Sequence, residues 1–223
     1  MNPLRRLSCA AVLLGSAGLA AAAPNAPRDG VEYRTLPQAV PADAGAKVEV
    51  IEFFAYYCPH CHAFEPALSA WVSKQGDNIV FKRVHVPQGP SVAPQQRLFY
   101  TLDAMGLLAR YHDKVFTAMH AERQRLATDE QVFDWAERSG IDRARFVETW
   151  RSFGVQARLR RAAEMMQAYQ VPHWPMVAID GRFLTSLALA SEGERGARTE
   201  AQLQHAALQV MDHLVAKAKA DKK

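Results

Sequence analysis

The sequence predicts an α/β fold that is interrupted by an all-helical block. A run of apolar and β-favouring residues at Val48–Phe54 leads directly into helix-compatible residues, and a second such run follows at 79–86. From residue 87 to about 163, apolar residues recur at helical spacing instead. A strand–turn–strand pattern returns at 176–184. The chain therefore has strands on both sides of a helical block.

We expect residues 1–22 to be a targeting segment rather than part of the fold. Arg5 and Arg6 form a short basic region, residues 7–20 are apolar, and the alanines at 20–22 offer a signal-peptidase site. The alternative is an uncleaved membrane anchor, but the apolar run is short for a span that takes about 20 residues. The sequence therefore predicts a periplasmic protein whose signal peptide is cleaved.

The cysteine content indicates redox chemistry rather than a disulfide scaffold. Of 3 cysteines in the chain, Cys9 leaves with the signal peptide, so Cys58 and Cys61 alone remain. An exported chain with one C-x-x-C pair and no other cysteine does not have the pattern of a disulfide-stapled domain. The thiol chemistry is therefore confined to this pair.

The charge balance excludes one class of partner. The formal net charge of +4 becomes +2 when Arg5 and Arg6 are removed with the signal peptide. The remaining Lys and Arg are scattered, as on solvated surfaces, so we expect no nucleic-acid partner. About 200 mature residues suffice for one or two domains, and we expect a monomer.

The first elements of the mature chain are a short strand at 31–36, a loop and the central strand. Pro37, Pro41 and Gly45 mark the loop. Within the central strand Val48–Phe54, Glu52 is an acid that stands between apolar residues. The strand pattern alone gives it an outward-facing place on a half-buried strand.

The two cysteines follow the central strand and open a helix that continues through 62–71. There the free N–H groups and the positive end of the helix dipole favour a thiolate at Cys58, while Cys61 lies one turn further in and is shielded. Pro59 suits an early helical position, which needs no hydrogen-bond donor. His60 adds a positive charge or an N–H donor beside Cys58. A thiolate stabilised in this way favours the reduced form and makes the disulfide a strong oxidant.

The strand at 79–86 is expected to pair in parallel with the central strand, with the first helix as the crossover. Helices then follow one another, with Gly106, Gly140 and Gly154 as stop signals. Thr128-x-x-Gln131 has the pattern of a capping box before one of them.

The last part of the chain returns to the sheet. A helix is predicted over 155–169, then a strand at Met176–Ile179, a tight turn at residues 180–181 and a returning strand at 182–184. The closing helix at 199–217 begins with a second Thr-x-x-Gln capping box.

The segment 53–66, FFAYYCPHCHAFEP, resembles the active-site segment of the DsbA family of the thioredoxin superfamily. The resemblance implies a thioredoxin-like fold with an inserted all-helical domain. It assigns residues 23–87 and 164–223 to the thioredoxin-like domain and residues 88–163 to the insertion.

The same resemblance implies roles for residues outside the cysteine motif. Glu52 would be buried beneath the cysteine pair and help to move protons during exchange. Pro175 would be a cis-proline facing the pair, with Pro172 as the second candidate for the cis bond. Trp174 would contact substrate, although its bulk departs from the small or β-branched residue expected there, which leaves the redox potential and the specificity open.

The activity that the resemblance implies is disulfide formation in exported polypeptides, with no cofactor or metal. The catalytic residues would be Cys58, Cys61, His60 and Pro59, and a DsbB-like, quinone-linked membrane protein would reoxidise the pair. A reductase or an isomerase of the same fold is the alternative within this chemistry. An isomerase of this superfamily usually has an N-terminal dimerisation domain, for which too few residues precede Val31.

Two alternatives belong to another class. The segment CPHCH also matches the c-type haem attachment pattern, with Met165 or Met176 as a second axial ligand. Alternatively, the two cysteines with His60 and His62 would bind zinc or copper, although structural zinc sites usually draw a second ligand pair from elsewhere.

Overall fold

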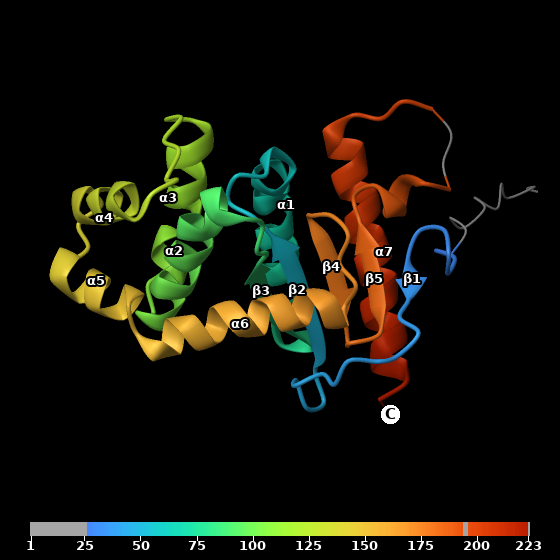
Figure 1. The fold of residues 1–223 in the computed structure, drawn as a ribbon. Helices are drawn as coiled ribbons and strands as arrows, with labels where there is room; N and C mark the ends of the chain where they lie inside the picture. Colours follow the sequence, from blue (N-terminus) through green and yellow to red (C-terminus); the bar gives the residue numbers. More distant parts are fainter. Residues whose placement is uncertain (1–25, 194–195, 223) are drawn as a thin grey trace, which may run out of the picture.

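The protein is built around one mixed five-stranded sheet (Figure 1). The computed structural model describes residues 26–193 and 196–222, so the predicted targeting segment lies outside the described residues. The strands are β1 (Arg34–Thr35), β2 (Val48–Phe54), β3 (Ile79–His85), β4 (Met176–Ile179) and β5 (Phe183–Ser186). Their order in the sheet is β1-β5-β4-β2-β3. The strand predicted at 31–36 is thus present but covers only two residues.

Strand β2 occupies an inner position of the sheet and is buried along its whole length. It pairs in parallel with β3 and antiparallel with β4. Helix α1 (Pro59–Gln75) connects β2 to β3, as the sequence predicts for a parallel pair. The cysteine motif therefore follows directly from an inner, fully buried strand.

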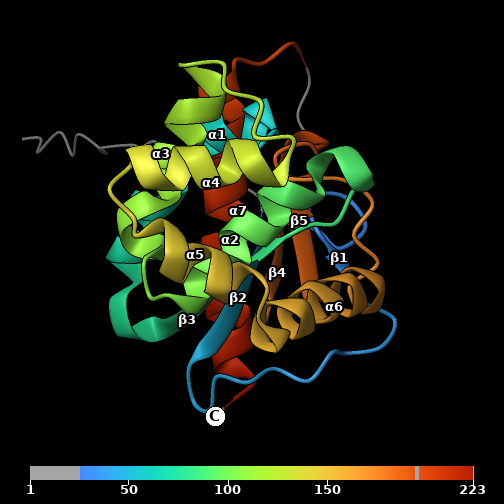
Figure 2. The same ribbon diagram turned by 60° about the vertical axis from the view of Figure 1, so that its left-hand side comes forward.

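Five helices lie between β3 and β4. They are α2 (Ala93–Ala104), α3 (Leu108–His120), α4 (Asp129–Arg138), α5 (Arg143–Trp150) and α6 (Phe153–Ala168). Helices α2 to α5 group beside the sheet, and α6 runs from them across its strands (Figures 1 and 2). We propose that residues 88–163 form the inserted unit; its second boundary falls within α6, which continues onto the sheet.

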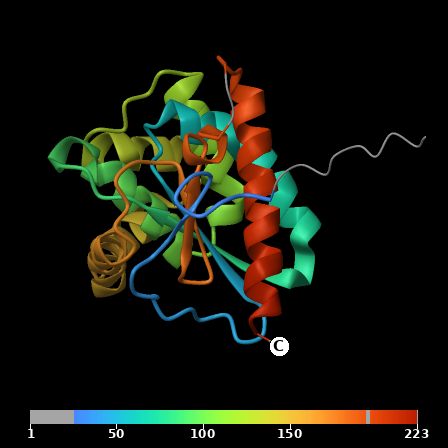
Figure 3. The same cartoon turned by 90° about the vertical axis from the view of Figure 1, so that its right-hand side faces the viewer.

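Helices cover both faces of the sheet. Val48 and Val50 of β2 pack with α1 and with the closing helix α7 (Glu200–Ala220) in one apolar cluster. Ile51 and Phe53, which point the other way, belong to a second cluster that includes the inserted helices. Figure 3 shows the strands between α7 on one side and α6 on the other. Since Glu52 alternates with Ile51 and Phe53, it faces α1.

The turn of the β4–β5 hairpin forms as predicted. Asp180 and Gly181 both have positive φ, 53° and 66°, which suits a tight hairpin turn. Gly181 has no room for a side chain, because a Cβ there would lie 1.8 Å from the Val40 carbonyl oxygen. This turn also binds the loop that leads to β2, since the Val40 N–H donates to the Gly181 carbonyl at 2.8 Å.

Two local predictions need correction. Gly154 does not end a helix: Ser152 caps α6 by accepting the Val155 N–H, so Gly154 lies in the first turn of that helix. Thr128 does cap α4, but the Gln131 side chain accepts the N–H of Ala127 rather than that of the cap residue. The full capping box is formed at the start of α7.

Within the part of the chain that the structure describes, no helix is both long enough and apolar enough to span a bilayer.

Candidate active site

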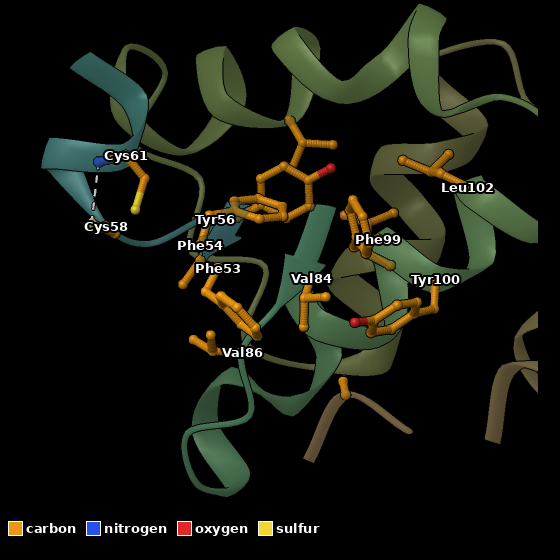
Figure 4. Packing of buried hydrophobic residues seen from close by; sticks show 14 of the residues in the cluster. Phe53, Phe54, Tyr56, Cys58, Cys61, Val84, Val86, Phe99, Tyr100 and Leu102 are labelled. Atoms are coloured by element: carbon orange, nitrogen blue, oxygen red, sulfur yellow. Dashed lines mark hydrogen bonds between the residues drawn. The ribbon is translucent and has the colours of Figure 1, made fainter. Parts of the chain in front are cut away.

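The cysteine pair lies where β2 ends and α1 begins. Cys58 is the N-cap residue of α1, and Pro59 occupies the first helical turn. The Cys58 N–H donates to the Ala55 carbonyl at 3.1 Å, which closes a tight turn between strand and helix. Its sulfur accepts the Cys61 N–H at 3.2 Å, the contact marked in Figure 4. The sulfur thus takes the place that a serine or aspartate oxygen takes in an ordinary N-cap.

The two cysteines differ in access to solvent. Cys58 retains 5% of its surface, whereas Cys61 retains none. Both are free thiols in this structure. An incoming sulfur therefore reaches Cys58 first, and Cys61 reacts from inside the protein.

The environments of the two sulfurs move their pKa values in opposite directions. Hydrogen bonding from the Cys61 side chain, the backbone N–H groups of Cys61 and His60, and the His60 charge lower the pKa of Cys58 to about 7 against the effect of burial. Burial raises the pKa of Cys61 far above its usual range, and the Cys58 sulfur and Glu52 raise it further. When the pair loses its first proton, the thiolate therefore forms on Cys58 and Cys61 stays a thiol.

His60 projects from the first turn of α1 to the surface. Its Nδ1 lies 3.3 Å from Oε1 of Glu200, at the start of α7. The charge of a protonated His60 is one of the causes that lower the pKa of Cys58. Glu200 therefore competes with the Cys58 thiolate for this charge.

The segment before β4 borders the exposed cysteine. The Trp174–Pro175 peptide bond is cis, and the bond before Pro172 is not among the cis bonds of the described residues. The Cys58 S–H points to the Trp174 carbonyl, 3.8 Å away. The Trp174 ring meets the Tyr57 ring edge-on, with centroids 6.2 Å apart. Trp174 therefore lies beside Cys58, and the role of Pro175 toward the pair stays a prediction.

Glu52 is buried, so its outward-facing alternative is wrong. It retains 1% of its surface and bonds the Arg83 Nε at 3.0 Å. Glu52 and Arg83 are direct neighbours in the parallel β2–β3 register. Burial raises the pKa of Glu52 to about 8, although the Arg83 charge acts against this shift. Because Glu52 also raises the pKa of Cys61, the two groups interact electrostatically.

Sequence reasoning missed the rest of the buried polar chain behind Glu52. Arg83 Nη2 also donates to Glu65 of α1, and the other Glu65 oxygen lies 3.4 Å from His112 Nε2 on α3. Two signals were available: Arg83 and Glu52 are each the fifth residue of their strands, and Glu65 follows Cys61 by four residues on one helix face. The partner on α3 had no such signal.

The haem and metal alternatives place His62 near the cysteines, but its ring packs elsewhere. It stacks on His120 of α3 with centroids 4.6 Å apart and 9° between the planes. His60, as described, pairs with Glu200. Among the residues that the structure describes, no group of three or more His, Cys, Asp or Glu side chains is arranged to hold a metal ion.

Comparison with known proteins identifies the family. The model of the DSBA-like thioredoxin domain matches residues 49–191. The chain belongs to the DSBA-like thioredoxin family. A DSBA-like relative from Burkholderia cepacia, a thiol:disulfide interchange protein DsbA, is 40% identical over 175 residues, which cover 78% of this chain and 82% of that protein. The protein of the same name from Bordetella parapertussis is 36% identical over 211 residues, covering 93% and 96%.

A solved DSBA-like structure gives the same result for the fold. The crystal structure of Pseudomonas aeruginosa DsbA superposes with a TM-score of 0.77 at 31% identity, over 86% of this chain and 94% of that chain. The DSBA-like fold predicted from the sequence is therefore confirmed.

Proposed function

We propose that the protein is a periplasmic thiol:disulfide oxidoreductase that introduces disulfide bonds into exported polypeptides, with Cys58 as the sulfur that meets the substrate. The observation that carries the proposal is the asymmetry of the pair. The Cys58 sulfur caps a helix and has a pKa lowered to about 7, while Cys61 is fully buried. A stabilised thiolate makes reduction of the enzyme favourable, so the disulfide tends to oxidise its substrates.

The first chemical step forms a mixed disulfide. A substrate thiolate attacks Cys58 in the Cys58–Cys61 disulfide; a new S–S bond forms, the old one breaks, and its electron pair goes to Cys61. Cys61 needs a proton at this moment, because burial strongly disfavours its thiolate. Glu52 is the proton donor, since it is buried and carries its proton up to about pH 8.

The second step releases the product. A second substrate thiolate attacks the substrate sulfur of the mixed disulfide, which completes the substrate disulfide and expels Cys58 as a thiolate. The helix N-terminus and His60 stabilise this leaving group, and a leaving thiol of low pKa departs faster. The substrate loses two electrons, which the enzyme holds as the two reduced cysteines.

The surroundings of Cys58 suit an extended polypeptide. The Trp174 carbonyl and the Tyr57–Trp174 aromatic pair border the sulfur, so substrate backbone and apolar side chains bind there. A DsbB-like membrane protein that passes electrons to quinone reoxidises the pair. The enzyme acts as a monomer in the periplasm after removal of residues 1–22, and it needs no cofactor.

The first experiment equilibrates purified mature protein with glutathione buffers and counts free thiols. We expect a potential well above that of glutathione, and rapid oxidation of a reduced dithiol peptide by the disulfide form. The Cys61→Ser variant should oxidise no dithiol peptide, because it cannot form the internal disulfide. A potential near that of thioredoxin, about −270 mV, would make the protein a reductase. A visible haem spectrum would reject the thiol chemistry altogether.

A further inference from the structure

Tyr56 is a buried residue of the loop that delivers Cys58, and histidines hold all three of its polar groups. It has no exposed surface and stands two residues before Cys58. Its backbone N–H, its backbone carbonyl and its hydroxyl each contact a different imidazole. In Figure 4 its ring points away from the two cysteines. A single residue thus ties the cysteine loop to its surroundings in three directions.

The first contact fixes the backbone to the sheet. The Tyr56 N–H donates to Nε2 of His85, the last residue of β3, at 3.0 Å. Nε2 must therefore carry a lone pair, so the imidazole proton is on Nδ1, which donates to the Val86 carbonyl at 3.1 Å. His85 is neutral in this arrangement, and both of its nitrogens are used.

The second contact fixes the same residue to the inserted helices. Nε2 of His120, the last residue of α3, lies 2.7 Å from the Tyr56 carbonyl oxygen. A carbonyl only accepts, so Nε2 of His120 carries the proton. The ring of His120 also stacks on His62.

The third contact uses the side chain. The Tyr56 hydroxyl lies 3.0 Å from Nδ1 of His112, which stands earlier on α3. His112 Nε2 in turn faces the carboxylate of Glu65 on α1 at 3.4 Å, so a neutral His112 donates to Glu65 and accepts from Tyr56. This contact joins the loop to the buried chain that ends at Glu52.

We infer that His85, His112 and His120 act together as a clamp on Tyr56 that positions Cys58, so that the inserted helices set the geometry of the redox site. The inference rests on the proposed function only where it gives the positioning of Cys58 a role in catalysis; the three contacts themselves do not depend on that function. Two of the three histidines belong to α3, and one to the thioredoxin-like unit. They are positioning residues, because they act through Tyr56 and not on substrate.

The clamp bears on the sulfur because the loop is short. The Ala55 carbonyl accepts the Cys58 N–H, so residues 55–58 form one turn with Tyr56 inside it. The Cys61 N–H, 3.2 Å from the Cys58 sulfur, is one of the groups that stabilise the thiolate, and it does so only while Cys58 stays within its reach. Freeing the Tyr56 carbonyl allows this turn to shift and lengthens that contact.

The test compares His120→Leu with His120→Gln in the full mature protein. Both variants remove the stacking on His62, but Gln keeps an N–H donor for the Tyr56 carbonyl. The Cys58 thiolate is titrated in the reduced protein by its ultraviolet absorbance, and the potential is measured against glutathione. We expect His120→Leu to raise the Cys58 pKa by about half a unit, because one hydrogen bond of the site is lost. Its potential should fall accordingly, and His120→Gln should stay near the parent.

The outcomes separate the clamp from other roles. Parent values in a folded His120→Leu protein would overturn the inference, and so would equal shifts in both variants, which would point to the lost ring. If His120→Leu does not fold, nitrogen NMR of the parent imidazoles decides: Nδ1–H on His85 and Nε2–H on His120 are expected, and the opposite tautomers would overturn the clamp. The thiolate titration needs no substrate, so a failure here is distinct from a failure of the proposed function.

Discussion

Replacing Glu52 with Gln tests the proton donor without changing the shape of the site. The substitution keeps the side-chain volume and a hydrogen-bond acceptor for Arg83, but the amide has no proton to give. Arg83 stays paired, because its other amino group binds Glu65. Any change in rate therefore reports on the ionisable proton rather than on a lost partner.

The size of the effect follows from the raised pKa. With a pKa of about 8, Glu52 carries its proton in about nine of ten molecules at pH 7 and in about one of ten at pH 9. The parent's rate constant for attack by the substrate thiolate should therefore fall about tenfold between these values. General acid catalysis contributes roughly 10²-fold or more. We expect Glu52→Gln to lose about this factor at pH 7 and to show no fall between pH 7 and pH 9.

The assay is a rapid-quench measurement of mixed-disulfide formation between the oxidised enzyme and a single-cysteine peptide. Rates are divided by the thiolate fraction of the peptide at each pH. Glu49→Gln is the matched control: Glu49 is a buried acid on the same strand, but it pairs with Lys82 on the other face at 2.6 Å. Its profile should follow the parent. Superimposable profiles for parent and Glu52→Gln would refute the role of Glu52.

Three further predictions concern the same site. Glu52→Gln should unfold at a higher temperature than the parent at pH 7 but not at pH 4. An acid whose folded-state pKa is raised loses stability as pH rises from about 4.5 to about 8, and equal melting temperatures at both values would contradict the raised pKa. Alkylation of reduced Cys58 by iodoacetamide should have its midpoint near pH 7; a midpoint at about 8.5, as for a free thiol, would contradict the stabilised thiolate. His60→Ser should raise the Cys58 pKa by about half a unit, as suits an exposed charge, and make the disulfide less oxidising; an unchanged potential in the glutathione assay would remove His60 from the mechanism.

The sequence was most informative where one physical requirement dominated. Strand β2 begins and ends as predicted, because a strand buried on both faces needs mostly apolar residues, and five of its seven residues are apolar. The cysteine motif was placed correctly, because Pro59 and the run before it are compatible with only one arrangement of strand and helix. The prediction that Gly154 ends a helix was wrong, because the sequence does not distinguish a glycine in the first turn of a helix from a glycine that ends one.

The residues that escaped prediction depend on contacts between distant segments. Whether Glu52 is buried is decided by α1 above it, not by its own strand. Tyr56 is an ordinary apolar position in the sequence, and its partners His112 and His120 lie 56 and 64 residues away. Their helical pattern indicates a buried face but not which loop that face meets. A single sequence contains no signal for such a pairing.

The order of the strands also determines when the site is complete during folding. The sulfur of Cys58 and the carbonyl of Trp174 are 116 residues apart in the chain. Parallel pairing of β2 with β3 closes a short loop, whereas β4 can join β2 only after the whole insertion between them has been synthesised. Long loops close slowly, because the entropy of the chain opposes the contact. A newly made chain therefore carries two accessible thiols for some time before it has an active site, and it should fold before it can serve as an oxidant.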